Sequence, residues 1–567
     1  MALASSLVLA TVAMPTSVAL AGPSAGRGHA VDPQDARLDF DSAVYTTIGV
    51  TVDDRPVNVR WYKEICYVAN PVAAAAQQPG GPGGGTTTIP NTACGYQSMN
   101  VFVPESAFGD QRAPVYFAVN NSGWMASYVK AGVTAGASYD SSTSNVGAAL
   151  KAGYVFVDVA NRSRGLVGAD GSSPGKAPAA AVDAKAAVRY LRLNDAAMPG
   201  SAERIVVNGT SGGGALASIL GAVRQRRRVR PPPRRDRRRR HRRQGPQHPA
   251  RRRLRRQRLL PDHRPRQRRH RLRVALQRPR YARRHRLQPL TRRRRSHRGA
   301  LRGIREEPGA VRNPDGTRLT AATLLDTVEK EVVRSAETYL EADPAHTIPP
   351  LGGTFEIASG GPGGPPTTKS YVNDWIDVDT ATGKVRSVDM TRYLAFVATQ
   401  ATLKTTPAFD AVGVNGNTSS RTETNLFGPP TQAYLNYTEY GWNHNDVAGD
   451  GSGLDDTGLT WKQYTAKQST TVDDQVHLIN PMDFVGTRAD TAPNWYVRHG
   501  TRDRDTAFTV SVNLDRALAA DKQVTNLDYR LAWNQPHAGN YDVPEAMAWI
   551  ADAVQKAGAP PASPRRG

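Results

Sequence analysis

The segment from Arg224 to Arg305 most constrains how this chain of 567 residues folds, because almost none of it suits a hydrophobic core. It contains about 37 of the 74 basic residues and only two acids, Asp236 and Asp262. The rest of the chain has about 37 basic and 48 acidic residues, so the formal charge of +24 comes from this segment. A packed domain must therefore be built from the residues before and after it.

The arginine-rich segment does not by itself predict a nucleic-acid partner. An exposed run of arginines binds any polyanion, but this run lacks lysine, has little aromatic content and shows neither helical nor strand periodicity. Basic arms usually mix both cations. We therefore expect no nucleic-acid partner, and we keep a non-catalytic polyanion-binding protein as a rival hypothesis.

Residues 1–21 predict a secretory signal peptide, with a disordered alanine-rich leader as the alternative. Their apolar run ends in Ala19-Leu20-Ala21, the small-x-small pattern that a signal peptidase accepts. No other run approaches the length of a membrane span, so we expect a secreted protein and no membrane partner. In an exported chain the only two cysteines, Cys66 and Cys94, favour one disulfide over two free thiols.

The spacing of apolar residues predicts an α/β fold. Early short runs alternate apolar and polar positions, as strands joined by turns do. Farther along, buried strands alternate with helical runs, which is typical of a mostly parallel sheet with helices on both faces. We expect residues 39–222 and 474–558 to form the sheet core and residues 309–473 to form a large inserted lid. Residues 223–308 are assigned to the arginine-rich segment.

The turn Gly209-Thr210-Ser211-Gly212-Gly213 has the pattern G-x-S-x-G between a β-branched strand and a helix. Only glycines beside the serine avoid collision in such a sharp turn, and the hydroxyl then projects above the sheet at the helix N-terminus. The pattern predicts Ser211 as a nucleophile, with a glycine-rich structural turn as the alternative.

Acyl transfer by a serine also requires N–H donors for the developing oxyanion. The backbone N–H of Gly212, directly after the serine, is the first candidate. We expect the second donor in a loop after an earlier strand, where Gly123 or Trp124 can point an N–H inward. The alternative for that loop is an ordinary turn.

A serine hydroxyl becomes a good nucleophile when a histidine removes its proton and an acid orients the histidine. In folds with this turn the order along the chain is serine, acid, histidine. His537 lies in a loop between a strand and the last helix, and Asp503 follows another strand, so we predict them as base and acid, with Asp505 the alternative acid. His477 and His499 are competing bases, but each adjoins or lies within a strand-like run, which favours a packed or surface histidine.

The acidic cluster from Asp446 to Asp456 does not predict a metal site. Its spacing misses the calcium-loop pattern D-x-[DN]-x-[DN]-G, which favours a solvated loop. We expect neither a metal nor a cofactor.

Five motifs together resemble bacterial tannases, the tannin acyl hydrolases of the α/β-hydrolase fold, which are related to feruloyl esterases. The motifs are GTSGGGALASILGA, GKAPAAAVDAKAAVRYLRLND, RNPDGT, NWYVRHGTRDRDT and QPHAGNYDV. The likeness spans nearly the whole chain except the predicted signal and the arginine-rich segment. It implies Ser211, Asp503 and His537 as a catalytic triad, and a lid inserted between core strands.

The resemblance also implies a small phenolic ester as substrate, with lid and core gripping the hydroxyls of a galloyl group. Asp505 resembles a hydroxyl-binding acid, and Lys404 and Glu423 resemble its lid partners. A site built to bond hydroxyls rejects analogues that lack them. We therefore expect a serine esterase acting on galloyl esters. A feruloyl or other hydroxycinnamoyl esterase is the nearest rival.

The arginine-rich segment is compatible with a reading-frame slip in a GC-rich gene. If each written codon ends in the first two bases of the true codon, arginine stands for Val, Ala, Asp, Glu or Gly. One permitted decoding of residues 259–275 is YCPITDLGNADIAYEWL, an ordinary globular sequence that resembles what tannases carry after the nucleophile turn. The slip would begin near Ala222 and end between Arg305 and Val311.

Translation of the segment as written would cut the helix behind Ser211 after about two turns. An inactive product is therefore a further alternative. The nucleotide sequence across Ala222 to Val311 tests the hypothesis, because a coding strand without a compensating insertion and deletion relative to close relatives would end it.

Overall fold

The structure is a computed structural model that describes most of the chain outside the arginine-rich segment. The described residues are 37–79, 85–130, 132–224, 311–359, 367–399, 410, 423–445, 459–467 and 471–558. The predicted signal peptide, the proposed frameshift, the acidic cluster of residues 446–456 and Lys404 all lie outside the described residues, so these points stay predictions.

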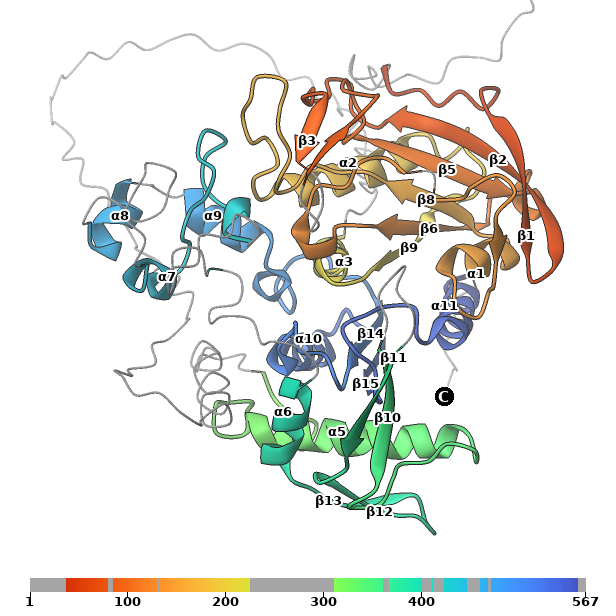
Figure 1. Ribbon diagram of the computed structural model, residues 1–567. Helices are drawn as coiled ribbons and strands as arrows, with labels where there is room; N and C mark the ends of the chain where they lie inside the picture. Colours follow the sequence, from red (N-terminus) through yellow and green to blue (C-terminus); the bar gives the residue numbers. More distant parts are fainter. Residues whose placement is uncertain are drawn as a thin grey trace, which may run out of the picture.

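A seven-stranded sheet forms the centre of the N-terminal part (Figure 1). Its strands lie in the order β7 (Ser138–Tyr139), β1 (Thr46–Val52), β2 (Arg55–Cys66), β5 (Ser98–Pro104), β8 (Val155–Val159), β6 (Pro114–Val119) and β9 (Ser201–Gly209). The pairs β1–β2, β2–β5 and β5–β8 are antiparallel, and the pairs β7–β1, β8–β6 and β6–β9 are parallel.

The sheet is therefore mixed, and the prediction of a mostly parallel sheet is not confirmed. The reason lies in the short turns of the first hundred residues. Asp53 and Asp54 join β1 to β2 with φ angles of 47° and 62°, and two left-handed residues in a two-residue loop form the turn that closes an antiparallel hairpin. The strands β8, β6 and β9, which are connected through longer segments that contain helices, pair in parallel.

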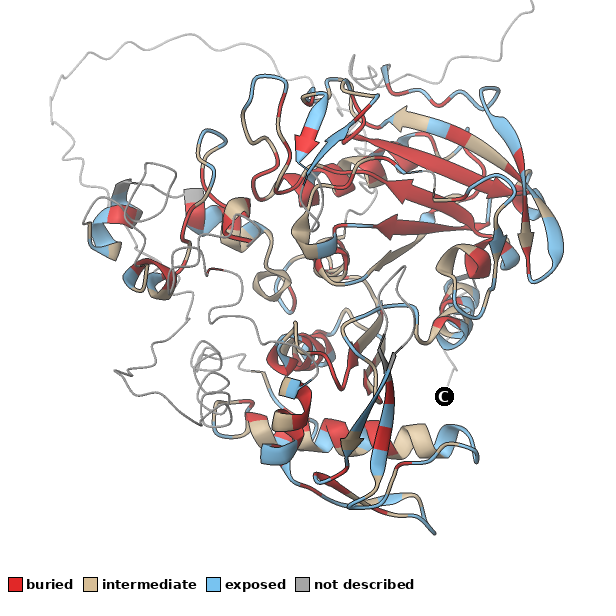
Figure 2. Ribbon diagram, viewed as in Figure 1, coloured by how far each residue is buried: buried red, intermediate tan, exposed pale blue. Residues whose placement is uncertain are grey.

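Helices cover both faces of this sheet. On one face α2 (Ala179–Leu193) and α3 (Gly212–Ala222) pack against alternate residues of β5, including Met99 and Val101. On the other face α1 (Asn145–Lys151) and α11 (Val543–Gly558) pack in a cluster that contains Phe102. Figure 2 shows β5, β8 and β6 buried along their length, as strands between two helical layers are. The 11 residues of α3 make about three turns, one more than expected.

The C-terminal part supplies a second, two-stranded parallel unit. Its strands are β14 (Asn494–Gly500) and β15 (Asn526–Ala532), with α10 (Phe508–Ala520) packed against both. The end of α3 reaches this unit, because Ala222 and Trp495 share one apolar cluster. Both β9 and β14 are less buried than β5, β6 and β8.

The predicted insertion forms two groups of elements, visible at the bottom and the left of Figure 1. The first group is α5 (Leu324–Ala342), β10 (Thr354–Ser359), β11 (Thr367–Val372), β12 (Ile376–Asp379), β13 (Lys384–Val388) and α6 (Met390–Thr399). The second group is η4 (Glu423–Leu426), α7 (Glu439–Asn443), α8 (Trp461–Lys467), α9 (Thr471–Leu478) and η5 (Pro481–Asp483), of which α9 and η5 extend past the expected end of the insertion at residue 473.

Both groups share apolar clusters with other parts of the chain. The first group shares one with α10 and β15, and residues of the second group pack against Ala177 and Trp124 of the N-terminal part. The role of this region as a lid stays a prediction.

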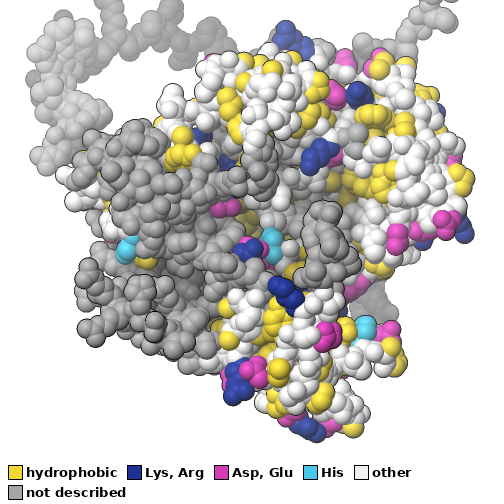
Figure 3. All heavy atoms as spheres, viewed as in Figure 1, with side chains coloured by type: hydrophobic (Ala, Val, Ile, Leu, Met, Phe, Trp, Pro, Cys, Tyr) yellow, Lys and Arg dark blue, Asp and Glu magenta, His cyan; other side chains and the backbone are white. Residues whose placement is uncertain are grey.

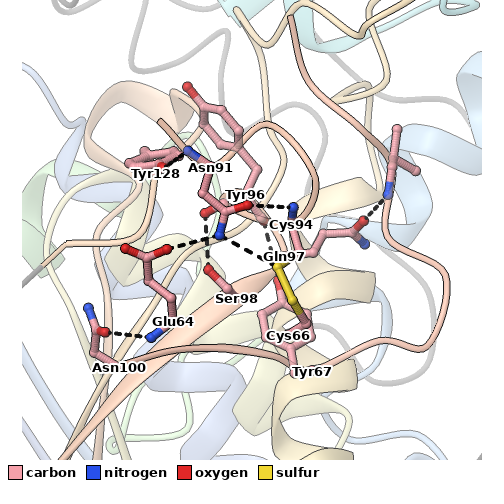
Figure 4. Close-up of a disulfide and its surroundings, with 12 residues drawn as sticks. Glu64, Cys66, Tyr67, Asn91, Cys94, Tyr96, Gln97, Ser98, Asn100 and Tyr128 are labelled. Carbon is pink, nitrogen blue, oxygen red and sulfur yellow. Dashed lines mark hydrogen bonds between the residues drawn. A yellow bond between two sulfur atoms is a disulfide. The ribbon is translucent and has the colours of Figure 1, made fainter. Parts of the chain in front are cut away.

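The two cysteines are joined in a disulfide between the end of β2 and Cys94 (Figure 4). The chain between them contains the small hairpin of β3 (Gln77–Pro79) and β4 (Thr86–Thr88). The Asn91 side chain donates to Glu64 at 3.0 Å and accepts from the Cys94 N–H at 3.0 Å. The disulfide is therefore part of a local network that holds a long loop against the sheet.

The described surface has mixed charge on the face shown in Figure 3, where basic and acidic side chains lie interspersed. Among the described residues, no helix combines the length and the apolar composition that a membrane crossing requires.

Candidate active site

Ser211 occupies the turn between β9 and α3 in a conformation that non-glycine residues seldom adopt. Its φ is 59° and its ψ is −124°, and α3 begins at the next residue. A strained backbone of this kind costs about 1–3 kcal/mol and persists only where the surrounding structure enforces it. The sequence pattern G-x-S-x-G predicted this turn. The strained conformation occurs where the serine joins the end of a strand to the start of a helix.

Two glycines of the turn show why it tolerates no side chain at positions 209 and 212. A Cβ on Gly209 would lie 2.3 Å from the carbonyl oxygen of Gly213, and a Cβ on Gly212 would lie 2.2 Å from the carbonyl oxygen of Asn121. Real Cβ atoms do not approach so closely. The second contact also means that the turn touches the loop after β6. This loop leads into the helical turn η3 (Ser122–Trp124).

His537 lies between Ser211 and Asp503. Its Nε2 is 3.0 Å from the Ser211 Oγ, and its Nδ1 is 2.8 Å from the Asp503 Oδ2. The His537 side chain is 28% exposed and the Asp503 side chain is 7% exposed, so the acid is buried beneath a base that reaches solvent. The three side chains come from residues up to 326 positions apart, yet they form one continuous chain of contacts.

The Asp503 carboxylate is held by several donors. Its Oδ1 accepts from the N–H groups of Asp505 at 2.7 Å and Thr506 at 2.9 Å, while its Oδ2 faces two histidines. Burial would raise the pKa of Asp503, but His499 and His537 beside it hold the pKa well below its usual range. The carboxylate is therefore ionised at neutral pH and can stabilise a protonated histidine.

The loop that carries His537 is fixed by the residues just before Asp503. The N–H of Arg502 donates to the Gln535 carbonyl at 2.9 Å, and the N–H of Asn534 donates to the Thr501 hydroxyl at 2.8 Å. A Cβ on Gly500 would lie 2.3 Å from the Gln535 carbonyl oxygen. The loops after β14 and β15 are thus in direct contact, because parallel neighbouring strands end at the same edge.

The two competing histidines have different surroundings. His477 on α9 contacts Asp483, with 3.0 Å between its Nδ1 and the carboxylate. His499 on β14 is buried, and its Nε2 lies 3.4 Å from the same Asp503 oxygen that contacts His537. Its Nδ1 is 2.6 Å from the Ser511 hydroxyl. His499 is therefore a packed histidine, as its strand position indicated, but one that touches the predicted acid.

The two predicted sources of the second oxyanion donor also differ. Gly123 and Trp124 both have left-handed φ angles, 56° and 58°, within η3. The Trp124 N–H donates to the Asn121 carbonyl at 2.9 Å. That bond engages the Trp124 N–H within its own turn, which leaves Gly123 as the better candidate.

One group of described side chains has the proximity that a metal ion requires. Single ligand atoms of Asp503, Asp505 and His537 all lie within 4.8 Å of one another. Two ligands at about 2.0–2.1 Å from a tetrahedral metal would stand more than 3 Å apart. The 2.8 Å between Asp503 and His537 is instead a hydrogen-bond distance, and the second His537 nitrogen faces Ser211. The geometry thus favours a proton-transfer site.

The chain is similar in fold to solved structures of bacterial tannases. The tannase from Lactobacillus plantarum is 21% identical, with 92% of this chain and 100% of that chain covered and a TM-score of 0.58. The tannase from Fusobacterium nucleatum is 20% identical, with 91% and 99% covered and a TM-score of 0.59. A tannin acyl hydrolase in complex with ethyl gallate is 21% identical, with 92% and 100% covered and a TM-score of 0.58.

The chain has the fold of the bacterial tannases. The resemblance predicted from the five sequence motifs is confirmed in this respect. The family model BD-FAE, which is feruloyl esterase-like, matches residues 99–240. No curated protein matches the sequence.

The predicted hydroxyl-binding residues come from both the core and the insertion. Asp505 adjoins the acid, and its carboxylate is 3.2 Å from the Arg504 guanidinium. Glu423 begins η4 in the insertion and is buried, with its carboxylate 3.8 Å from Arg164. Lys404 lies outside the described residues. The structure therefore places two of the three predicted residues, one on each part of the chain.

Sequence reasoning missed two residues that contact the η3 turn, where the second oxyanion donor is predicted. Ser163 and Arg164 follow β8 and donate to the carbonyls of Trp124 and Gly123, each at 2.6 Å. A signal for them existed, because β8 and β6 are parallel neighbours and their following loops must meet at one edge. The pairing of the strands had to be known before that signal could be used.

Proposed function

We propose that the chain is a secreted serine esterase that hydrolyses galloyl, tannin-type phenolic esters through an acyl-enzyme. The observation that carries the proposal is the continuous contact from Ser211 through His537 to Asp503, with heavy-atom distances of 3.0 and 2.8 Å. These are the distances that a nucleophile, its base and an orienting acid require. The tannase fold supports the same reaction class.

In the proposed first step, His537 takes the Ser211 proton at Nε2 as the serine Oγ attacks the ester carbonyl. Asp503 accepts the Nδ1–H of His537 and stabilises the imidazolium that forms. The tetrahedral oxyanion is stabilised by the N–H of Gly212 and by a donor of the η3 turn, for which Gly123 is our candidate. His537 then returns the proton to the leaving alcohol.

In the second step, His537 takes a proton from water as the water attacks the acyl-enzyme, and returns it to the Ser211 Oγ as the bond to the acyl group breaks. The hydroxybenzoate is released and Ser211 is regenerated. The proposed selectivity comes from the acyl side. Asp505 and Glu423, together with Lys404, would bond the ring hydroxyls. Solved tannin acyl hydrolases in complex with ethyl gallate and with 3,4-dihydroxybenzoate support a small hydroxylated aromatic ligand for this fold.

The test is hydrolysis of methyl gallate by the wild type and by Ser211→Ala. We expect gallate release by the wild type and a loss of about 10⁶-fold in kcat in the variant. Ser218→Ala is the matched control, because this hydroxyl on the same helix donates only to the Gly214 carbonyl in the described structure. Equal activity of wild type and Ser211→Ala would refute the proposed nucleophile.

A hydroxycinnamoyl esterase is the second candidate, and the BD-FAE match favours it. Methyl ferulate in the same assay separates the two, because a galloyl site that bonds vicinal hydroxyls should prefer methyl gallate by about 10²-fold or more. The polyanion-binding rival predicts no ester hydrolysis together with salt-sensitive binding of nucleic acid. An inactive frameshifted product predicts no hydrolysis until the reading frame of the arginine-rich segment is corrected.

Secretion is a separate part of the proposal. It rests on the predicted signal of residues 1–21, and the disulfide between Cys66 and Cys94 supports an oxidising compartment. Expression followed by N-terminal sequencing of exported protein tests it. A mature protein that begins near Gly22 is expected, and retention of the full leader in the cell would contradict it.

A further inference from the structure

The turn at Gly123 and Trp124 is strained, and yet it must keep a fixed position beside the nucleophile. Both residues have left-handed φ angles, 56° and 58°, and tryptophan has no intrinsic tendency to adopt that conformation. The turn touches Gly212, since a Cβ there would lie 2.5 Å from the Trp124 nitrogen. Something must therefore hold the turn in place beside the nucleophile.

The loop after β8 provides that support through two side chains. Arg164 donates from Nε to the Gly123 carbonyl at 2.6 Å, and Ser163 donates from Oγ to the Trp124 carbonyl at 2.6 Å. The Ala126 N–H donates to the Arg164 carbonyl at 3.0 Å, so the backbones are also joined. Each carbonyl of the two left-handed residues thus has its own donor. Because a carbonyl shares a plane with the N–H of the next residue, the two bonds fix the peptide groups that follow Gly123 and Trp124, and with them the conformation of the turn that presents the Gly123 N–H.

Arg164 has a second contact on the other side. One terminal nitrogen lies 3.8 Å from the Glu423 carboxylate, and the two side chains are 7% and 11% exposed. Burial lowers the pKa of the Arg164 guanidinium, and the Glu423 charge offsets part of that effect. An arginine can serve both partners because its planar group carries several donors in fixed directions.

The segment that begins at Glu423 is docked on the same part of the core. Lys176 donates to the carbonyls of Asn425 at 2.7 Å and Ala433 at 2.8 Å, and the Ala177 N–H donates to the Leu426 carbonyl at 2.7 Å. These bonds hold η4 in place through the backbone, independently of the Glu423 side chain. The Arg164 guanidinium is then one of the groups that position the Glu423 carboxylate.

We propose that Arg164 is a positioning residue that joins the η3 turn to the Glu423 carboxylate, so that hydroxyl binding by Glu423 and oxyanion stabilisation by Gly123 are coupled. The inference rests on the proposed function, in which Gly123 and Glu423 have those roles. A substrate hydroxyl bonded to Glu423 is therefore expected to raise kcat as well as to lower KM. The bond fixes the Arg164 guanidinium through Glu423, and the guanidinium fixes the turn.

The test compares Arg164→Met, Arg164→Lys and Glu423→Gln with methyl gallate and methyl benzoate. We expect Arg164→Met to lower kcat for methyl gallate by about 100-fold, the order expected for a displaced catalytic group. It should also reduce the preference for methyl gallate over methyl benzoate. Lysine keeps the charge and loses the second donor direction, so Arg164→Lys should lie between the wild type and the methionine variant.

Arg162→Lys is the matched control for a structural effect. Arg162 is in the same loop and pairs with the buried Asp183 at 2.7 Å. This substitution should lower stability without changing the substrate preference. The double variant Arg164→Met/Glu423→Gln should be no worse in preference than Arg164→Met alone. Full additivity of the two changes, or an unchanged kcat and preference in a folded Arg164→Met, would overturn the proposal.

A readout that does not use a phenolic ester separates this inference from the proposed function. A fluorophosphonate labels an active serine through the oxyanion donors, so its labelling rate should fall in Arg164→Met and persist in Glu423→Gln. Labelling of the wild type without gallate release would refute the phenolic-ester proposal and leave the effect of Arg164 on the turn measurable. Equal labelling rates of wild type and Arg164→Met would refute the positioning role.

Discussion

The nucleophile side of the candidate site, formed by Ser211, Gly212 and the η3 turn, is fixed mainly by its backbone. The acid–base side, formed by Asp503 and His537, is fixed mainly by hydrogen bonds between loops. On the nucleophile side, a single added methyl group would meet backbone at 2.2 Å. On the acid–base side, side chains and N–H groups converge on one carboxylate. The first side is therefore sterically determined, and the second depends on a network.

Apart from removal of the nucleophile itself in Ser211→Ala, the largest effect should come from the acid–base side, through Asp503→Asn. The amide leaves the shape intact but cannot stabilise the imidazolium, and a comparable change in a serine protease lowers kcat about 10⁴-fold. Steady-state hydrolysis of methyl gallate measures it. A loss below tenfold would mean that another acid, with Asp505 the first candidate, orients His537.

The same variant has a predicted effect on stability against pH. The folded pKa of Asp503 lies below its ordinary value of about 3.9, so the ionised carboxylate stabilises the fold above that pH and loses this contribution as the pH falls. The wild type should therefore lose stability more steeply than Asp503→Asn on acidification below about pH 4. Thermal unfolding at several pH values checks this slope.

The next effect should come from the nucleophile side, through Gly212→Ala. Its Cβ would meet the Asn121 carbonyl and the Trp124 nitrogen, so the turn must shift and the oxyanion donors with it. Loss of such a donor costs about 10²–10³ in kcat. Gly214→Ala on the same helix is the control, because its Cβ would lie 3.1 Å from the Gly209 carbonyl and requires only a small adjustment.

A smaller effect should follow from His499→Gln, which changes the network without removing a member of the predicted triad. His499 lies 3.4 Å from Asp503, and losing a weak bond to a charged group costs about 1 kcal/mol, or about fivefold in rate. The pH profile of kcat/KM should shift, since one neighbour of Asp503 is lost. An unchanged profile would leave His499 with a packing role only.

The smallest effect on activity should come from replacing both Cys66 and Cys94 by serine. The disulfide closes a loop with a sequence separation of 28 residues, and its loss should lower the free energy of unfolding by about 2–4 kcal/mol. Because the glycine turn fixes the nucleophile side locally, kcat should stay near the wild-type value. Denaturant unfolding and a methyl gallate assay measure the two quantities, and a large fall in kcat in a folded variant would show that the nucleophile side also depends on distant restraints.

Local sequence was enough to predict the parts of the site that sterics dictate. The glycines beside Ser211 identified the strand, the turn and the helix, because only that backbone requires glycine at both positions. The short turns of the first hundred residues also indicated strands. Their antiparallel pairing was overlooked, although the Asp53-Asp54 turn was a signal for it.

The contacts of Arg164 and His499 could not be predicted in the same way. Arg164 lies 41 residues from Gly123, and its role follows from the parallel pairing of β6 with β8. The strand position of His499 favours a packed or surface histidine, but its distance to Asp503 depends on how the loop after β14 folds back. Both require knowledge of which strands are neighbours.

The sequence by itself therefore determined the backbone of the nucleophile turn and the kind of residues that could serve as base and acid. Steric exclusion acts over a few bonds, so it is written in consecutive residues. Tertiary structure alone decided which histidine faces Ser211, which donors hold Asp503, and how Arg164 meets both Gly123 and Glu423. Those contacts join residues from 34 to 326 positions apart, and only the packing of the strands and loops brings them together.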